Sequence, residues 1–567
     1  MTFERLLAHA REVVACLNAV GIHRNDRVAI VLPNGPEMAV AFLSIACGAV
    51  AAPLNPAYGA AEFEFYLSDL DARALVVQAG LASPAVDVAR SRGIPVVEIV
   101  PKGQDAAGLF EFRGVSSAPG SSPDIAEAED IAMVLHTSGT TSRPKMVPLT
   151  HQNLCASAHH VGEALALTPS DCCLNIMPLF HIHGLVGAVL SSLGAGASVV
   201  ATPGFDAPRF FDWVSAFQPT WYTAVPTMHR AILGRNTQNG QPIDRGRLRF
   251  IRSCSSPLPP TLMVELESRF GVPVVEAYGM TEASHQMACN PLPPAIRKPG
   301  SVGVATGTET AIMQAGGARL LAPGEVGEIV VRGPNVMRGY ANQVSDQAFT
   351  DGWFRTGDLG HLDADGYLFI EGRIKEIVNR GGEKISPREV EEVLLQHPAV
   401  AQAVVFALPD QALGQDVGAA VVLRDPGVTE RQLRQFVAAR LVHFKVPSRV
   451  IVLDALPLGP TGKPQRIGLA EKLGLTEQAA PAPEFSRELV APRTPEEEFL
   501  AEVWCEVLSL PSVGIHQRFL DVGGDSLLAA RTVARVCQQL DVDLNLLDFL
   551  DAPTIADQAL MLADKMQ

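Results

Sequence analysis

The sequence predicts an α/β protein with largely parallel sheets, followed by a small α+β domain and an all-α C-terminal domain. Three observations support this prediction. Over the first two thirds of the chain, short apolar runs alternate with segments whose apolar residues have helical spacing. Near Gly366–Gly372 this alternation gives way to a hairpin-like pattern. After Pro495 the pattern is mostly helical. A chain of 567 residues is also too long for one hydrophobic core, so several domains are expected.

The first part of the chain alternates between two periodicities. Thr2–Val20 and Glu37–Cys47 carry apolar residues at helical spacing. Short apolar runs follow each of them, and strands that alternate with helices favour a largely parallel sheet. The predicted strands are Arg27–Leu32, Val50–Leu54, Ala74–Val77, Ser198–Thr202, Phe250–Arg252 and Val274–Glu276.

The rest of the chain divides into smaller pieces. GYLFIEGR at 366–373 has a hairpin-like pattern, and 386–475 alternates helix, strand, helix and strand. Ala479–Glu484 (AAPAPE) is rich in Ala and Pro, which is typical of a linker. We therefore expect domains at 1–372, 373–475 and 495–567, with a linker at 476–494.

Composition excludes several classes of partner. Lys and Arg number 45 against 61 Asp and Glu, and the net charge of -16 disfavours nonspecific binding of nucleic acid or anionic membrane. The nine Cys form no CxxC pair, so we expect a reduced, cytoplasmic location. Two uncharged stretches, Ala39–Leu54 and His181–Phe205, are interrupted by Gly and Ser, which predicts buried elements and no membrane span.

Residues 136–147 (HTSGTTSRPKMV) combine hydroxyl side chains, a glycine and Lys145. Hydroxyls and backbone N–H groups in such a loop can hold a polyphosphate, and a lysine adds positive charge. The Gly-Lys-Ser/Thr order of a Walker loop is absent. On the residues alone, a phosphate-binding loop and a polar turn both stay open.

TSGTTSRPK resembles the signature loop of the adenylate-forming superfamily, which includes acyl-CoA synthetases, adenylation domains of nonribosomal peptide synthetases, and luciferases. Ser142 stands where the family usually has Gly. The resemblance covers about residues 2–470, because six further motifs follow in the family order. They are MPLFHIHG at 177–184, EAYGMTEASH at 276–285, GEIVVRGPNVMRGY at 327–340, GWFRTGDLG at 352–360, GYLFIEGRIKEIVNRGGEKISP at 366–387 and PTGK at 460–463.

The resemblance implies an adenylation core domain that activates a carboxylic acid with ATP and Mg²⁺. Tyr278 resembles the residue that stacks on adenine, and Asp358 resembles the carboxylate that accepts the ribose hydroxyls, with Arg373 as a second ribose contact. Glu282 resembles the magnesium ligand, and Mg²⁺ commonly takes one or two carboxylates plus phosphate oxygens. The other expected nucleotide contacts are Thr137, Ser138, Gly139, Thr140, Thr141, Lys145, Gly279 and Thr281.

The resemblance also implies a mobile C-terminal adenylation subdomain. Lys463 of PTGK matches the lysine that bridges the acid and the α-phosphate, where a positioned cation contributes roughly 3–4 kcal/mol, like one oxyanion donor. Lys375 within RIKE matches the hinge about which the small domain rotates for the second half-reaction. The GGEK segment at 381–384 resembles the face that then lines the pantetheine tunnel.

Residues 519–530 (FLDVGGDSLLAA) resemble the attachment motif of peptidyl and acyl carrier proteins. The resemblance covers about residues 495–562 and implies a carrier helical bundle. Gly523 and Gly524 permit a tight turn, after which Ser526 stands at the start of a helix. A phosphopantetheinyl transferase is thus an expected partner, with 4′-phosphopantetheine attached to Ser526. A tethered thiol reaches an effective concentration of about millimolar or more.

The expected acid pocket contains several polar side chains, and in a pocket for a fatty chain unpaired polar groups would be costly. They are His181, His183, Ser253, Ser255 and His285, of which His181 is also expected to act in catalysis. A small polar acid, such as a dicarboxylate, suits them better. The motifs PLFHIHGL, WYTAVPTMH and IRSCSS resemble those of oxalate–CoA ligases. An aryl or short aliphatic acid stays open.

Three functions remain at this point. In the first, the chain is a loading didomain that passes its acyl group to a downstream condensation or ketosynthase protein in trans. In the second, it is an oxalate-like CoA ligase that releases free acyl-CoA. The third is an inactive adenylation scaffold that acts as a binding protein. The presence of Lys463, Asp358 and Glu282 favours an active enzyme.

Overall fold

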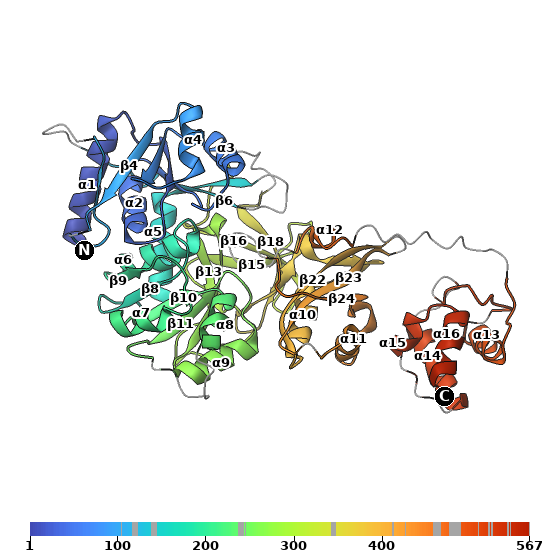
Figure 1. The fold of residues 1–567 in the computed structure, drawn as a ribbon. Coiled ribbons are helices and arrows are strands. Elements are labelled where there is room, and N and C mark those ends of the chain that lie inside the picture. Colours follow the sequence, from blue (N-terminus) through green and yellow to red (C-terminus); the bar gives the residue numbers. More distant parts are fainter. Residues whose placement is uncertain are drawn as a thin grey trace. The chain divides into compact units, whose positions relative to one another are not determined.

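The computed structural model describes residues 1–103, 105–115, 123–137, 144–235, 243, 245–341, 348–410, 413–425, 427–457, 466–475, 489–508, 510–519, 522, 526–540, 542, 544 and 546–565. The chain separates into two compact units, Met1–Lys375 and Glu376–Gln567. Figure 1 shows the helices and strands of both.

The first sheet of the N-terminal unit has seven strands in the order β5-β4-β3-β1-β2-β6-β7. From β4 through β6 the neighbours run parallel, and β5 and β7 add antiparallel edges. Val28–Val31 is a continuous apolar run, and all four of its side chains are fully buried. The strands are β1 (Arg27–Val31), β2 (Val50–Pro53), β3 (Ala74–Gln78), β4 (Val96–Pro101), β5 (Phe110–Phe112), β6 (Ile131–Thr137) and β7 (Lys145–Thr150).

A second sheet of seven strands has the order β14-β13-β12-β11-β10-β8-β9. The strands from β9 to β12 are parallel, and β13 and β14 are antiparallel. The carboxyl ends of β10, β11 and β12 therefore meet at one edge, which is where ligands bind in open α/β sheets. The strands are β8 (Cys172–Asn175), β9 (Ser198–Ala201), β10 (Trp221–Ala224), β11 (Phe250–Cys254), β12 (Val274–Met280), β13 (His285–Cys289) and β14 (Val304–Ala305).

Helices pack against these two sheets (Figure 1). Thr150 caps α5 by accepting a hydrogen bond from the backbone N–H of Asn153, and the Asn153 side-chain oxygen accepts one from the backbone N–H of Thr150. The helices are α1 (Phe3–Ala19), α2 (Pro36–Ala46), α3 (Ala60–Asp69), α4 (Pro84–Ser91), α5 (His151–Ala164), the π-helix η1 (His183–Leu190), α6 (Ser191–Gly194), α7 (Phe210–Phe217), α8 (Pro226–Arg235), α9 (Pro260–Phe270) and the 3₁₀ turn η2 (Thr281–Ala283).

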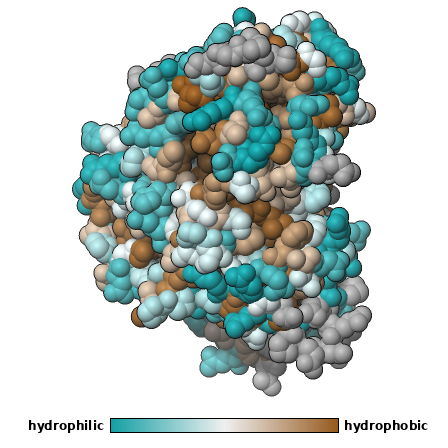
Figure 2. Space-filling model, turned by 90° about the vertical axis from the view of Figure 1, so that its left-hand side faces the viewer, coloured by the Kyte–Doolittle hydropathy of each residue, from teal (hydrophilic) through white to brown (hydrophobic). Residues whose placement is uncertain are grey.

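Most of the two uncharged stretches is buried, as predicted, although β9 at the end of the second stretch is partly exposed. Phe42 of α2 and Leu185 of η1 belong to the same large core cluster. No helix in the described part of the chain is long and apolar enough to cross a membrane. On the face shown in Figure 2, hydrophobic residues form small patches among hydrophilic ones.

A third sheet completes the N-terminal unit and is antiparallel throughout, which the sequence did not reveal. Its strands run in the order β15-β16-β18-β17, with β19 on β18. The predicted hairpin near residue 366 joins β18 to β19, with Asp358 opposite Arg373. The strands are β15 (Glu309–Met313), β16 (Gly327–Arg332), β17 (Phe349–Thr350), β18 (Trp353–Leu362) and β19 (Leu368–Arg373).

The second unit begins next to the 3₁₀ turn η4 (Ile374–Glu376) with a five-stranded mixed sheet in the order β21-β20-β23-β22, with β24 on β23. Its strands are β20 (Val378–Arg380), β21 (Glu383–Ile385), β22 (Val400–Asp410), β23 (Gly414–Leu423) and β24 (Arg449–Val452). Its helices are α10 (Pro387–Gln396), α11 (Glu430–Ala438), the 3₁₀ turn η5 (His443–Lys445) and α12 (Leu469–Lys472). This is the α+β pattern expected for 373–475.

The last part of the chain is helical. Trp504, Phe519 and Phe549 pack edge to face or tilted at the centre of a separate core. The buried indole N–H of Trp504 donates to Gln558 Oε1 at 3.0 Å. This bond satisfies the one polar group of the indole, which packing against other rings cannot do. The helices are α13 (Pro495–Leu508), α14 (Ser526–Leu540), α15 (Leu546–Asp551) and α16 (Ile555–Lys565).

Candidate active site

A buried carboxylate lies where the second and third sheets meet. Tyr278 of β12 donates its phenol hydrogen to Asp358 Oδ2 at 2.5 Å, and Arg373 Nε lies 3.2 Å from Asp358 Oδ1. Burial, followed by the Asp358 charge, holds the pKa of Tyr278 well above its ordinary value, so the phenol remains a donor. The strand register of the β18–β19 hairpin places Asp358 directly opposite Arg373. The arrangement fixes a hydrogen-bond acceptor at this point.

Glu282 is a second buried carboxylate in the same unit. Tyr340 donates its hydroxyl to Glu282 Oε1 at 3.0 Å, and Lys145 Nζ lies 4.3 Å from the centroid of the Tyr340 ring. Burial raises the pKa of Glu282, against the Tyr340 hydrogen bond and the charges of Arg373 and Lys145. A divalent cation would compensate this buried negative charge, so the residue fits a magnesium ligand.

The Ser/Thr-rich segment of the sequence falls between β6 and β7, which pair as antiparallel neighbours. Thr137 ends β6, Lys145 begins β7, and the two residues are paired in register. Thr137 Oγ1 is buried and has no hydrogen-bond partner among the described residues, so a phosphate oxygen would satisfy it. Ser138, Gly139, Thr140 and Thr141 lie outside the described residues.

The predicted acid-pocket residues gather around a buried cation that sequence reasoning missed. Arg252 of β11 is fully buried. Its Nη1 lies 3.2 Å from Thr223 Oγ1 and 3.4 Å from His183 Nε2. Its Nη2 lies 2.9 Å from His285 Nε2 and 2.8 Å from Gln286 Oε1. The available signal was one charged residue inside the apolar strand FIRSC, since buried charges are found paired.

Hydrogen bonds link this cluster to the predicted serines and histidines. His183, at the start of the π-helix, places Nε2 at 2.6 Å from Thr223 Oγ1 and Nδ1 at 3.0 Å from Ser255 Oγ. The rings of His183 and His285 stack with centroids 5.1 Å apart. Ser253 is buried, and its hydroxyl has no partner among the described side chains and backbone. Four of the five polar side chains expected in the pocket therefore lie near one another, on β11, directly after it, on β13 or on η1.

His181 lies just before the π-helix, partly exposed, with its ring 4.6 Å from that of Phe180. Chain connectivity keeps it within two residues of His183. The expected catalytic role of His181 stays a prediction.

The backbone near the cluster is strained in the way that functional sites often are. Ser255 has φ of 73° and His285 has φ of 111°, in a region that residues other than glycine rarely adopt. Gly187 and Gly279 permit the close approach of His285. A Cβ on Gly187 would stand 2.3 Å from His285 Nε2, and one on Gly279 would stand 1.8 Å from the His285 carbonyl oxygen.

Three further predicted residues stand at or beyond the end of the first unit in sequence. Lys375, the expected hinge, lies in the 3₁₀ turn η4 and is the last residue of the first unit. Lys463 lies outside the described residues. Ser526 is the first residue of α14, and a helix N-terminus suits the phosphodiester of a phosphopantetheine arm.

Arg466, three residues beyond Lys463 in sequence, forms an ion-pair cluster that sequence reasoning also missed. Its Nη2 donates to Glu391 Oε1 at 2.8 Å and its Nε to the Val405 carbonyl at 2.7 Å. It pairs in addition with Glu376, which directly follows Lys375. Burial raises the pKa of Glu391, and the positive charge of Arg466 opposes that shift.

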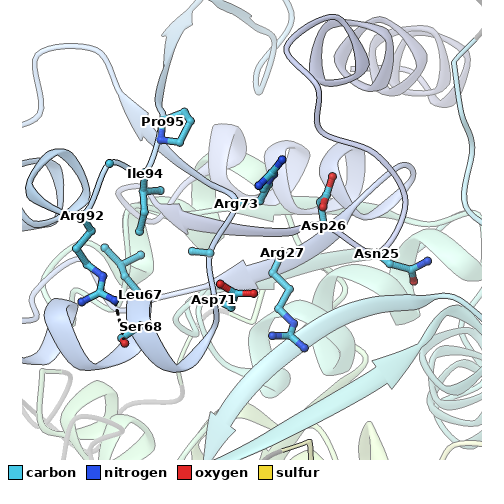
Figure 3. A pocket seen from close by; sticks show the side chains of 12 residues that line it. Asn25, Asp26, Arg27, Leu67, Ser68, Asp71, Arg73, Arg92, Ile94 and Pro95 are labelled. Carbon is cyan, nitrogen blue, oxygen red and sulfur yellow. Dashed lines mark hydrogen bonds between the residues drawn. The ribbon is translucent and has the colours of Figure 1, made fainter.

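A surface hollow of about 480 Å³ lies elsewhere in the first unit (Figure 3). Arg27, Arg73 and Pro95 line it beside the starts of β1, β3 and β4, so it lies at the amino ends of parallel strands, opposite the edge where ligands bind. Two of its arginines are already engaged, because Arg92 pairs with Glu64 and Arg27 donates to a backbone carbonyl. None of the predicted site residues lines this hollow.

Comparison with known proteins gives three family matches along the chain. Residues 1–341 match the AMP-binding enzyme family, residues 389–463 match the AMP-binding enzyme C-terminal domain, and residues 498–562 match the phosphopantetheine attachment site. The order agrees with the core, subdomain and helical region described above.

Similar proteins include a probable CoA ligase, CCL9, from Humulus lupulus, 45% identical over 496 residues that cover 86% of this chain and 94% of the relative. An oxalate–CoA ligase from Arabidopsis thaliana is 46% identical over 456 residues, which cover 79% and 88%. ATP-bound MatB from Rhodopseudomonas palustris superposes with a TM-score of 0.75 and 32% identity over 83% of this chain and 93% of that one.

The o-succinylbenzoate CoA synthetase MenE from Bacillus subtilis, in complex with ATP and a magnesium ion, gives a TM-score of 0.71 at 30% identity, covering 82% of this chain and 93% of MenE. The fold, the three family matches and these relatives agree. The chain belongs to the AMP-binding, adenylate-forming family of acyl-CoA ligases, which use ATP, and it carries a phosphopantetheine attachment domain after the adenylating core.

Proposed function

We propose that this chain adenylates a small dicarboxylic acid and passes the acyl group to the thiol of a phosphopantetheine arm on its own Ser526. The observation that carries the proposal is that one chain contains both a nucleotide-type cluster around Asp358 and a carrier-type helix that begins at Ser526. The site lies in the N-terminal unit and the acceptor in the same chain, so the thiol would be tethered at a concentration of about millimolar or more.

The nucleotide contacts follow from the two buried carboxylates. Asp358 accepts the hydroxyls of the ribose, with Arg373 beside it, and the Tyr278 ring packs against the adenine. Thr137, Lys145 and Thr281 contact phosphate oxygens, together with the loop residues Ser138 to Thr141. Gly279, where the His285 backbone leaves no room for a side chain, is the remaining proposed nucleotide contact.

Glu282 would hold Mg²⁺ together with phosphate oxygens of ATP. Bound magnesium would neutralise charge on the departing pyrophosphate. Glu282 serves this role because Tyr340 orients one of its oxygens.

Lys463 supplies the cation that stabilises charge on the α-phosphate when the carboxylate attacks, a contribution of roughly 3–4 kcal/mol. The mixed anhydride that results has AMP as a good leaving group. Lys375 is the hinge at which the small domain then turns, which removes Lys463 and brings the GGEK segment at 381–384 to the site. Phosphopantetheine, once attached, supplies the thiol for the second half-reaction.

The acid is a small, polar one. The Arg252 cluster places several polar groups at the carboxyl ends of β10 and β11, and among them the buried Ser253 hydroxyl has no partner in the described part of the chain, so a fatty chain would leave it unpaired. The Arabidopsis relative acts on oxalate by its name, which makes oxalate the first acid to test. Malonate, hydroxy acids and benzoates follow.

A CoA ligase that releases free acyl-CoA is the second candidate. The names of the relatives favour it, because both CCL9 and the Arabidopsis protein are CoA ligases. Under the first proposal the partners are a phosphopantetheinyl transferase and a condensation or ketosynthase protein in trans, in the cytoplasm.

The adenylation step is tested by acid-dependent exchange of labelled pyrophosphate into ATP over a panel of oxalate, malonate, glycolate, benzoate and octanoate. We expect strong exchange with oxalate or malonate and a fall of about 300-fold or more in Lys463→Ala. The core's own thermal unfolding should stay unchanged in that variant. Exchange at the wild-type rate in Lys463→Ala would contradict the proposed mechanism.

A further inference from the structure

The Arg252 cluster forms a hydrogen-bond relay whose direction can be deduced. Arg252 only donates, because a guanidinium carries five N–H groups and no acceptor. Its Nη1 donates to Thr223 Oγ1 at 3.2 Å, so that hydroxyl is an acceptor on one side. The 2.6 Å contact assigns the Thr223 hydrogen to His183 Nε2, because Arg252 Nη1, which can only donate, also lies 3.4 Å from that nitrogen.

This fixes the proton on the His183 ring. Because Nε2 accepts from Thr223 and also lies 3.4 Å from Arg252 Nη1, it carries no hydrogen. The neutral imidazole therefore has its hydrogen on Nδ1, which donates to Ser255 Oγ at 3.0 Å. A second positive charge on this ring is disfavoured beside a buried guanidinium.

Ser255 is the last member of the relay. Its oxygen accepts from His183, and its own hydrogen has no acceptor in the described part of the chain. Ser255 is partly exposed, whereas Arg252, Thr223 and His183 are buried, and its φ of 73° turns it out of the regular course of β11. The relay thus runs outward from a permanent cation to a hydroxyl that faces the accessible side.

We propose that Arg252 is a positioning and specificity-determining residue, which acts through Thr223 and His183 to make the Ser255 hydroxyl a committed donor to the second carboxylate of the acid. The inference rests on the proposed function, because it takes this cluster as the acid pocket. A committed donor favours a ligand group that only accepts, such as a carboxylate, over a methyl group that cannot. Arg252 therefore contributes to dicarboxylate selection without touching the acid.

The sharpest test is Thr223→Val, because Arg252→Ala would leave four buried acceptors without their donor and puts folding itself at risk. Valine has the shape of threonine and removes only the hydroxyl. We expect the ratio of kcat/KM for oxalate to that for acetate to fall about tenfold, through a higher KM for oxalate, since one hydrogen bond to a charged group is worth about 1.5 kcal/mol. Thr223→Ser restores the hydroxyl and should rescue the ratio.

A matched control and a double-mutant cycle separate the relay from a structural effect. Thr220→Val removes another buried threonine hydroxyl near the same strand, one that donates to Asp171 Oδ1 at 2.7 Å, and should leave the ratio unchanged. Ser255→Ala should lower the ratio as Thr223→Val does. Because the two residues act in series, Thr223→Val should have no further effect in the Ser255→Ala background. Additive effects, or a ratio within twofold of wild type in Thr223→Val, would overturn the relay.

A readout without turnover keeps this test independent of the proposed substrate. In protein with ¹⁵N-labelled histidine, the His183 signal, assigned by its loss in His183→Asn, should show an unprotonated Nε2 in wild type and a mixture of tautomers in Thr223→Val. If wild type turns over neither oxalate nor malonate, the proposed dicarboxylate function fails on that result alone. A protonated Nε2 in wild type would refute the relay, whichever acid the enzyme uses.

Discussion

Two clusters of the N-terminal unit differ in how they hold charge. In the first, Asp358 is buried but Arg373 keeps 46% of its side chain exposed, and the pair is set by the register of a single hairpin. In the second, Arg252 is fully buried, and its partners come from β10, β13 and the π-helix. The first cluster is local and reaches solvent, whereas the second depends on the packing of several elements.

The difference teaches that binding strength and selectivity are built in different ways here. A nucleotide bound by every family member needs a few strong contacts that short motifs can supply. Choice of acid needs a buried polar network in which each group is satisfied by a particular neighbour. Changes in the first cluster should therefore affect all acids equally, and changes in the second should affect one acid more than another.

The largest expected effect belongs to Asp358→Ala. It removes the carboxylate proposed to accept the ribose hydroxyls, together with the partner of the Tyr278 hydroxyl and of Arg373 in this pair. We expect kcat/KM for ATP to fall by about 100- to 1000-fold, since two hydrogen bonds to a charged group are lost. The loss should be the same with oxalate and with acetate in steady-state assays, and an acid-dependent loss would break the distinction between the two clusters.

Glu282 should make magnesium use depend on pH. Burial raises its pKa above the ordinary value of 4.5, so as pH falls the carboxylate protonates earlier than a free one and stops binding the cation. The apparent affinity for Mg²⁺ should fall about tenfold for each pH unit below the raised pKa. Titration of Mg²⁺ at pH 5 to 8 measures this effect, and Glu282→Gln should remove it.

The same shift has a consequence for stability. A carboxyl whose pKa is raised by folding binds its proton more tightly in the folded state, so it costs stability as pH rises from 4.5 through the raised value. Without magnesium, Glu282→Gln should thus unfold at a higher temperature than wild type at pH 7, and the gap should close toward pH 4. If the difference in unfolding temperature between the variant and wild type stayed the same from pH 7 to pH 4, burial would not raise the pKa of Glu282.

Gly187→Ala probes the acid cluster sterically. The new Cβ would stand 2.3 Å from His285 Nε2, so the imidazole must move away from Arg252. We expect KM for oxalate to rise about 10-fold and the free energy of unfolding to fall by about 1–3 kcal/mol. The KM for ATP should stay within twofold, and Gly234→Ala, where a Cβ meets nothing within 4 Å, is the control.

Tyr278→Phe should have the smallest effect. It keeps the ring and removes the hydroxyl that donates to Asp358 at 2.5 Å. We expect KM for ATP to rise about 5- to 10-fold, with little change in kcat, because the loss is one hydrogen bond to a carboxylate. A fall in kcat as large as that of Asp358→Ala would show that the hydroxyl, rather than the ring, carries the role.

The sequence predicted much of the fold for reasons that the structure makes plain. Strands β1, β2 and β3 are continuous apolar runs buried on both faces, so their pattern was unambiguous. The antiparallel third sheet was not separated, because β18 mixes buried and half-exposed positions and pairs with β16 over a bulge. The helical region after Pro495 followed from its periodicity.

The candidate site was predictable only where a motif marked it. Tyr278, Asp358 and Arg373 stand in recognisable motifs, and the structure brings them within hydrogen-bonding distance of one another. Arg252 was missed, since a single charged residue in a strand carries no local pattern, and Tyr340 ends the motif at 327–340 but was given no role. Their partners lie far away in sequence, and only packing reveals them.

The central claim is that the acyl group ends on the chain itself, and intact-protein mass measures this most directly. The chain should first be modified by a phosphopantetheinyl transferase and then incubated with ATP, Mg²⁺ and oxalate, with and without free CoA. The account predicts an added acyl mass on the wild-type chain and none on Ser526→Ala. Unchanged protein mass together with free oxalyl-CoA would contradict it and would establish the CoA ligase instead.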